Sequence, residues 1–181
     1  MAMSDPEKVT CLHKLKDIHT FVFDMDGVLT NGKLFISNSE EWFRTMSVKD
    51  GYALQLAIKK GYRILVLSGS DAPSVKKRME KLGVNNVFFK VKDKKTFLEN
   101  FFKENNIFPE NVLYMGDDIP DAEAMAYCGI AACPADSVSE IIDISEYISP
   151  SMGGEGCVRD VIEKVMKIHG KWNHNSEITS T

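Results

Sequence analysis

The stretch Phe21-Val22-Phe23-Asp24-Met25-Asp26-Gly27-Val28-Leu29-Thr30 indicates both the fold and the chemistry of this chain. The apolar run that leads into it, His19 to Phe23, is typical of a short strand buried on both faces of a parallel sheet. Two acids spaced by two positions follow directly, before a glycine. Buried carboxylates are unfavourable unless they are paired or bind a cation. We therefore take Asp24 and Asp26 as candidate functional residues.

Further apolar runs alternate with helical stretches on the carboxyl side of this strand. This alternation predicts a doubly wound α/β fold, Rossmann-like, with a parallel sheet. The predicted strands are 19–23, 63–67, 86–89, 111–115, 129–132 and 147–148, and the predicted helices are 51–60, 72–82, 94–105, 121–128 and 158–169. We predict one domain over residues 17–170, an N-terminal segment over 1–16, and a polar tail over 171–181 that is disordered.

One segment, residues 31–46, breaks the alternation and is predicted to be a β-hairpin. Its strands are Lys33 to Ile36 and Glu41 to Thr45, joined by a turn at Ser37-Asn38-Ser39. Apolar side chains lie on more than one face of this hairpin. Because an isolated hairpin is marginally stable in water, we expect it to pack against something, and a second subunit is a candidate.

Composition excludes several classes of function. The chain has 181 residues and a net charge of −4, without a dense basic run, so nucleic-acid binding is not expected. No apolar stretch approaches the ~18 residues of a membrane span. The N-terminus has no signal-peptide-like apolar region, and the four cysteines form no CxxC pair. These features favour a cytoplasmic protein with reduced thiols.

Polar residues gather where the predicted strands end, which is where open α/β sheets bind ligands. Asp24 and Asp26 follow the first strand, Ser68-Gly69 the second, and Gly116-Asp117-Asp118-Ile119-Pro120-Asp121 the fourth; Lys94 comes after the third. Clustered carboxylates attract Mg²⁺. A lysine and a hydroxyl can offset the charge of a phosphate while a carboxylate attacks it. The set therefore predicts magnesium-dependent phosphoryl transfer.

In this order, DMDGVLT, SG, a downstream Lys and GDDIPD resemble the four motifs of the haloacid dehalogenase superfamily of phosphatases. The resemblance implies that Asp24 is the nucleophile and Asp26 the general acid and base. It implies that Ser68 binds phosphate and that Lys94 stabilises nucleophile and phosphate. Magnesium would be held by Asp24, Asp117 and the backbone carbonyl of Asp26, with support from Asp118 and Asp121.

The spacing between motifs leaves no room for a cap domain. Asp24 and Ser68 are separated by the hairpin and one helix, and Ser68 and Lys94 by one helix and one strand. A capless chain with DGVLTNGKLFIS, PENVLYMGDDIPD and GGEGCVRDV is similar to the 3-deoxy-D-manno-octulosonate 8-phosphate phosphatase family. That family implies a phosphorylated keto sugar acid as substrate, a place in lipopolysaccharide biosynthesis, and a homotetramer formed through the 31–46 hairpin.

The same resemblance implies substrate or interface contacts from residues outside the four motifs. These are Thr30, Lys49, Asp50, Gly69, Ser70 and the segment Gly153–Arg159, which includes Arg159 and which in the family approaches a neighbouring active site. After the second-motif glycine the octulosonate phosphatases usually carry Arg, whereas this chain has Ser70. A family glycine is replaced by Lys90. Glu155 is closer to the 2-keto-3-deoxynononate 9-phosphate phosphatases.

Alternative functions therefore stay open. The substrate is octulosonate 8-phosphate in the leading hypothesis, and 2-keto-3-deoxynononate 9-phosphate or N-acetylneuraminate 9-phosphate in the second. A third hypothesis is a low-activity domain that partners a sugar-acid cytidylyltransferase, which the intact acids disfavour. Dehalogenase chemistry is disfavoured because a halide needs no protonation by an acid at position 26.

Overall fold

The computed structural model describes residues 13–38, 42–173 and 178, and its centre is a six-stranded parallel sheet. The strands are β1 (Thr20–Asp24), β4 (Arg63–Leu67), β5 (Asn86–Phe88), β6 (Val112–Met115), β7 (Ile130–Cys133) and β8 (Tyr147–Ile148), in the order β5-β4-β1-β6-β7-β8. The predicted doubly wound fold is confirmed. Because β1 is flanked by β4 and β6, the chain winds outward in both directions from β1, and its carboxyl end is the topological switch point.

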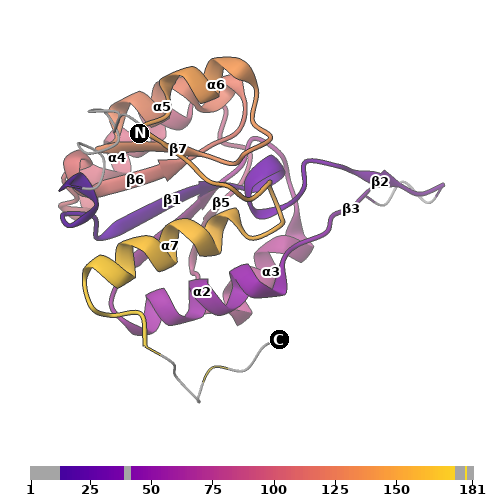
Figure 1. Cartoon of the computed structure of the whole chain (residues 1–181). Coiled ribbons are helices and arrows are strands. Elements are labelled where there is room, and N and C mark those ends of the chain that lie inside the picture. Colours follow the sequence, from indigo (N-terminus) through magenta and orange to yellow (C-terminus); the bar gives the residue numbers. More distant parts are fainter. Residues whose placement is uncertain (1–12, 39–41, 174–177, 179–181) are drawn as a thin grey trace, which may run out of the picture.

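Helices cover both faces of the sheet (Figure 1). One face carries α2 (Val48–Lys59), α3 (Pro73–Lys81) and α7 (Cys157–Ile168); the other carries α4 (Lys94–Asn105), α5 (Ala122–Tyr127) and α6 (Ser139–Ile144). Successive β1 side chains serve opposite faces: Phe21 and Phe23 pack toward α2 and α7, and Val22 toward α4 and α5. This two-sided burial explains why the centre of β1, Phe21 to Phe23, is apolar.

Local sequence explains where α2 begins. Ser47 caps α2, because its Oγ accepts a hydrogen bond from the backbone N of Asp50 at 3.3 Å. The helix therefore starts at Val48, three residues before the predicted start at Gly51. Gly51 lies inside α2, at a point where a Cβ would come within 3.3 Å of Nη2 of Arg78 on α3. The missing side chain lets the two helices approach.

The hairpin is shorter than predicted and projects from the body of the molecule (Figure 1). It consists of β2 (Phe35–Ile36) and β3 (Trp42–Phe43), and part of the predicted second strand, residue 41, lies outside the described residues. All four strand residues are exposed, Phe35 by 69%. An isolated bridge between Thr30 and Met46 closes the base of the hairpin and returns the chain to the end of β1.

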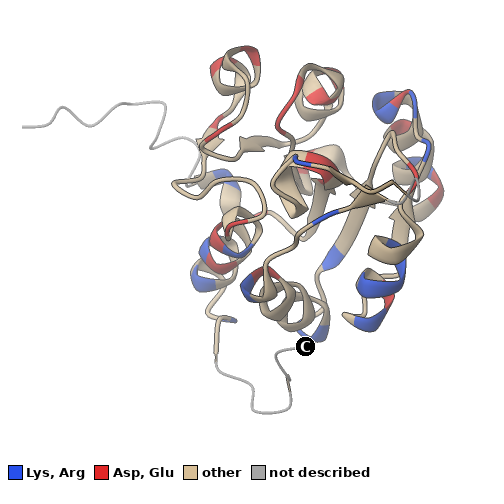
Figure 2. Ribbon diagram, turned by 90° about the vertical axis from the view of Figure 1, so that its right-hand side faces the viewer, with Lys and Arg blue, Asp and Glu red and all other residues tan. Residues whose placement is uncertain are grey.

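The two ends of the chain are only partly described. Most of the predicted N-terminal segment, residues 1–12, and residues 174–177 and 179–181 of the predicted disordered tail lie outside the described residues. Among the described residues of that tail, Trp172 packs against Tyr52 of α2, and Ile178 is buried against the core. Among described residues, no helix is long and apolar enough to cross a membrane. Acidic and basic residues are interspersed along the helices (Figure 2).

Candidate active site

The carboxyl end of β1 places two acids at the switch point of the sheet. Asp24 is the last residue of β1 and only 7% exposed, and Asp26 lies in the turn Met25–Leu29 that follows. Gly27 in this turn has φ +93°. A Cβ on Gly27 would lie 1.9 Å from Oδ2 of Asp117, so only glycine leaves room for that carboxylate. The turn thus brings the ends of β1 and β6 together.

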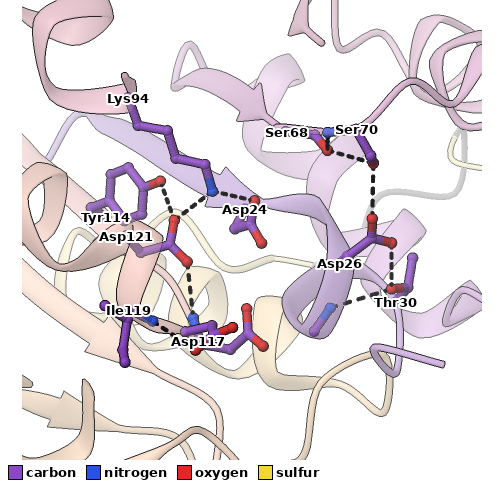
Figure 3. Close-up of polar contacts among 12 residues, drawn as sticks. Asp24, Asp26, Thr30, Ser68, Ser70, Lys94, Tyr114, Asp117, Ile119 and Asp121 are labelled. Carbon is purple, nitrogen blue, oxygen red and sulfur yellow. Dashed lines mark hydrogen bonds and ion pairs between the residues drawn. The ribbon is translucent and has the colours of Figure 1, made fainter. Parts of the chain in front are cut away.

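Lys94 lies between two carboxylates and ties three strand ends into one network (Figure 3). Its Nζ is 2.6 Å from Oδ1 of Asp24 and 2.6 Å from Oδ1 of Asp121. The hydroxyl of Tyr114, on β6, donates to the same Asp121 oxygen at 2.6 Å. The other Asp121 oxygen accepts from the backbone N of Asp117 at 3.3 Å. Both oxygens of Asp121 therefore already accept from protein donors, and this carboxylate orients its neighbours.

The carboxylates of this network fit a divalent cation. One oxygen each of Asp24, Asp117 and Asp121 lie within 4.8 Å of one another. Oδ1 of Asp117 is buried without a hydrogen-bond partner in the described structure. An orphaned carboxylate oxygen beside two other acids is what a bound Mg²⁺ would satisfy. Since Asp121 already has its donors, Asp24 and Asp117 are the better side-chain ligands.

The electrostatics of the cluster point the same way. Burial, together with the charge of Asp121, raises the pKa of Asp24 to about 7. Burial, together with Asp24 and Asp121, raises the pKa of Asp117 to about 8. Burial acts to lower the pKa of Lys94, but the charges of Asp24 and Asp121 outweigh it and the pKa is raised. Raised pKa values of this kind indicate that the cluster has too little positive charge to keep its acids ionised. A bound cation would supply that charge.

Asp26 belongs to a second network on the other side of the site. Arg44 binds it with two hydrogen bonds, from Nε to Oδ1 at 2.7 Å and from Nη2 to Oδ2 at 3.1 Å. The Ser70 hydroxyl donates to Oδ2 at 3.0 Å, and Ser70 Oγ lies 3.0 Å from Ser68 Oγ (Figure 3). The Thr30 hydroxyl donates to Oδ1 at 3.4 Å. Every oxygen of Asp26 thus accepts from at least two donors.

A cavity of about 470 Å³ opens between the two networks. Its lining contains most of the residues that the motifs single out: Asp24, Asp26, Ser68, Gly69, Ser70, Lys94, Asp117, Asp118 and Asp121. Lys92 also lines it. The structure therefore brings the predicted catalytic and metal-binding residues to one place.

Three predicted substrate contacts lie off this cavity in the described chain. Thr30 is fully buried, and its Oγ1 accepts from the backbone N of Gly27 and of Gly32, both at 3.3 Å, so it braces the turn. Lys49 is exposed near the start of α2. The Arg159 guanidinium lies over the rings of Tyr52 and Trp172. Substrate contact by these residues stays a prediction.

The segment Gly153–Arg159 packs against the turn Met25–Leu29, which carries Asp26. The backbone N of Gly154 donates to the carbonyl of Val28 at 2.9 Å. A Cβ on Gly153 would lie 1.9 Å from the carbonyl O of Gly27, so the two loops touch through their backbones. Asp50, 2% exposed, accepts from the backbone N of Arg159 at 2.7 Å and so connects α2 to the start of α7. These contacts fix the turn that carries Asp26.

Arg44 is the site residue that sequence reasoning missed. It is 18 positions from Asp26 and belongs to none of the four motifs. Its approach depends on the fold-back of the hairpin at Thr30 and Met46, which is a tertiary contact. The only available signal was an arginine at the end of a hairpin that returns to the first motif.

Comparisons with known proteins agree with this geometry. No protein-family model matches the chain. The chain is 28% identical over 166 residues to the 3-deoxy-D-manno-octulosonate 8-phosphate phosphatase of Escherichia coli K12. The matched region covers 92% of this chain and 88% of the relative. It is 29% identical over 158 residues to the same enzyme of Haemophilus influenzae, covering 87% of this chain and 88% of the relative.

Solved structures give the same result. The phosphatase of this name from Moraxella catarrhalis, in complex with magnesium, phosphate and a KDO molecule, superposes with a TM-score of 0.85 at 28% identity, covering 88% of this chain and 91% of that one. A cobalt-bound form of the deoxy-D-mannose-octulosonate 8-phosphate phosphatase from H. influenzae gives 0.82 at 29% identity, covering 87% and 92%.

Proposed function

We propose that this chain, which belongs to the 3-deoxy-D-manno-octulosonate 8-phosphate phosphatase family of the haloacid dehalogenase superfamily, is a magnesium-dependent phosphatase that hydrolyses 3-deoxy-D-manno-octulosonate 8-phosphate. The observation that carries the proposal is the cavity in which Asp24, Lys94 and the orphaned oxygen of Asp117 meet. A nucleophile, a fixed positive charge and carboxylates able to hold a divalent cation are what phosphoryl transfer requires.

In the first step, a carboxylate oxygen of Asp24 attacks phosphorus. Lys94 holds Oδ1 of Asp24, which leaves the other oxygen for the attack. A bond forms between that oxygen and phosphorus while the bond from phosphorus to the sugar oxygen breaks. Asp26 donates a proton to the departing oxygen, so the sugar acid leaves as an alcohol. The product on the enzyme is an aspartyl-phosphate at Asp24.

In the second step, Asp26 takes a proton from water. The water oxygen bonds to phosphorus, the bond to Asp24 breaks, and inorganic phosphate leaves with Asp24 restored. Ser68 supplies a hydroxyl and Lys94 a positive charge to the phosphate oxygens. Mg²⁺, which Asp24, Asp117 and the backbone carbonyl of Asp26 would hold, supplies further positive charge against the phosphate. Asp118 and Asp121 support this site, Asp121 by orienting Lys94 and the backbone of Asp117.

The test is a comparison of kcat/KM on octulosonate 8-phosphate, 2-keto-3-deoxynononate 9-phosphate and N-acetylneuraminate 9-phosphate, each with Mg²⁺ and with EDTA. Octulosonate 8-phosphate should be the best substrate, and only with Mg²⁺. Asp24→Asn should remove phosphate release while the far-UV spectrum is unchanged. A flat, poor profile across the three substrates would overturn the sugar-acid assignment. Turnover in EDTA would overturn the metal site.

We also propose that the chain works in the cytoplasm as a homotetramer that buries the hairpin. Support comes from the apolar residues that the hairpin exposes, including Phe35 at 69%, Ile36 at 64% and Trp42 at 55%. Exposed apolar patches of this kind mark interaction sites. Phe35→Glu should reduce the mass measured by light scattering, whereas Phe108→Glu, a change at an equally exposed residue away from the hairpin, should not. A monomeric wild-type chain at working concentration contradicts the proposal.

A further inference from the structure

The proposed acid, Asp26, is fully occupied by donors in this structure. Arg44 binds both of its oxygens, and Thr30 and Ser70 each add a hydrogen bond. A carboxyl group that donates a proton to a leaving oxygen must present one of its own oxygens to that atom. The forked guanidinium covers both. The arrangement therefore describes a resting state that substrate has to rearrange.

Arg44 is placed for such a rearrangement. Its side chain is 6% exposed, whereas that of Asp26 is 33% exposed toward the cavity. Nη2 of Arg44 lies 3.3 Å from the hydroxyl of Ser70, which lies 3.0 Å from the hydroxyl of Ser68. The guanidinium is thus two hydrogen-bonded steps from the proposed phosphate position. Ser70 has a short side chain, which leaves the space beside Asp26 to the arginine.

The other surroundings of Arg44 also allow movement. Arg44 lines a second cavity of about 400 Å³, under the hairpin, together with Trp42, Met46 and Val48. The side chain therefore stands between this space and the site that contains Asp26. Its backbone follows β3, in a hairpin that contacts the body through the bridge at Met46.

We propose that Arg44 is an additional substrate-binding residue, whose guanidinium passes from Asp26 to the phosphate of the substrate and so frees Asp26. This rests on the proposed function. A planar guanidinium binds carboxylate and phosphate with the same two-pronged geometry, and a phosphate ester carries more charge than one carboxylate. Arrival of phosphate thus offers Arg44 a stronger partner within reach. The exchange couples phosphate binding to release of the acid.

The competing explanation is that Arg44 only anchors the hairpin. In that case its guanidinium stays on Asp26 when phosphate binds, and the two residues affect phosphate affinity through charge alone. If the Arg44–Asp26 contact is the same with and without phosphate, it cancels from the binding free energy, and the separate Coulomb effects of the two fixed charges on phosphate add. Exchange predicts a coupling, because removing Asp26 releases Arg44 for phosphate only when Arg44 is present. A double-mutant cycle therefore separates the two explanations.

The experiment measures the Kd of inorganic phosphate by calorimetry, with saturating Mg²⁺, for wild type, Asp26→Asn, Arg44→Ala and the double variant. With Arg44 present, Asp26→Asn should tighten phosphate binding about tenfold more than it does in the Arg44→Ala background, within the roughly 2- to 160-fold span of coupled neighbours. Arg63→Ala, an exposed arginine at the start of β4, serves as control and should leave Kd unchanged.

Equal effects of Asp26→Asn in both backgrounds would overturn the exchange and leave Arg44 an anchor. Light scattering on each variant checks that the oligomeric state is the same, so a change of assembly is not mistaken for coupling. Arg44→Lys keeps the charge but not the fork, and should recover only part of the coupling. Failure of the proposed function looks different: the wild-type chain itself then releases no phosphate from any sugar-acid phosphate, whatever the cycle shows.

Discussion

Asp117→Asn should make the metal-free protein more stable while abolishing its response to magnesium. Burial and the neighbours Asp24 and Asp121 raise the pKa of Asp117 to about 8, so at pH 7 the fold keeps this carboxyl group largely protonated, and its Oδ1 has no partner in the described structure. The substitution removes the free-energy cost of keeping that group uncharged. An asparagine Nδ2 in the same place can donate to the Asp24 carboxylate. We therefore expect that Asp117 is kept for metal binding although it lowers the stability of the metal-free fold.

The magnitude follows from the pKa of Asp117, which is raised from 3.8 to about 8 by burial and by Asp24 and Asp121. One pKa unit corresponds to about 1.4 kcal/mol, which sets an upper limit of about 4 kcal/mol at pH 7. Partial solvent exposure and shared repulsion with Asp24 reduce it. We expect a gain of about 1–3 kcal/mol in the metal-free free energy of unfolding.

Urea unfolding at pH 7, in EDTA and at several Mg²⁺ concentrations, measures both effects. The wild type should gain about 2.7 kcal/mol when Mg²⁺ is at 100 times its Kd, whereas Asp117→Asn should gain almost nothing. Asp17→Asn removes the same charge at an exposed site and should change stability by less than about 0.5 kcal/mol. If Asp117→Asn lowers metal-free stability, or keeps the response to Mg²⁺, the assignment of Asp117 is refuted.

Two further predictions concern the same site. Gly27→Ala places a Cβ 1.9 Å from Oδ2 of Asp117, so it should strongly reduce both kcat/KM and the stabilisation of the protein by Mg²⁺. The control is Gly61→Ala, at a similar positive φ but with nothing within 4 Å of the added Cβ. It should cost only the backbone strain of about 1–3 kcal/mol and leave activity unchanged. The pKa values of Asp24, Asp50 and Asp117, about 7, 6 and 8, all exceed their unfolded value of 3.8, so the folded state binds more protons. Metal-free stability should therefore fall as pH rises from about 4 to about 8, and urea titrations that show a rise would contradict the burial of these groups.

The fold was predictable because most elements follow local rules. The strands β1, β4 and β6 are apolar in their central residues, and polar residues lie at or just beyond their carboxyl ends. The helix Lys94–Asn105 was predicted with its observed bounds. The helix α6, Ser139–Ile144, was missed. With six residues it is shorter than the span over which helical periodicity can be recognised, and it is stabilised by Ile141 packing on the sheet.

The site was predictable only where its residues follow strands in the sequence. Asp24, Ser68 and Asp117 are brought together by the parallel arrangement of the sheet, which the strand order makes unavoidable. The partners of Asp26 are different in kind. Arg44 reaches it through a hairpin whose direction is set by one backbone bridge. A strand motif carries no information about such a contact, and the chain was expected to use the hairpin for assembly alone.

The position of Arg44 connects the hairpin to the active site as well as to the proposed subunit contact. Arg44 directly follows β3, whose Trp42 and Phe43 are among the exposed apolar residues proposed to meet another subunit. A partner that covers these rings would also restrict the backbone that carries the guanidinium. The proposed assembly and the occupation of Asp26 would thus be linked through one residue. It follows that phosphate affinity should be measured on every hairpin variant, because a change that loosens the assembly also alters the competition between Asp26 and phosphate for Arg44.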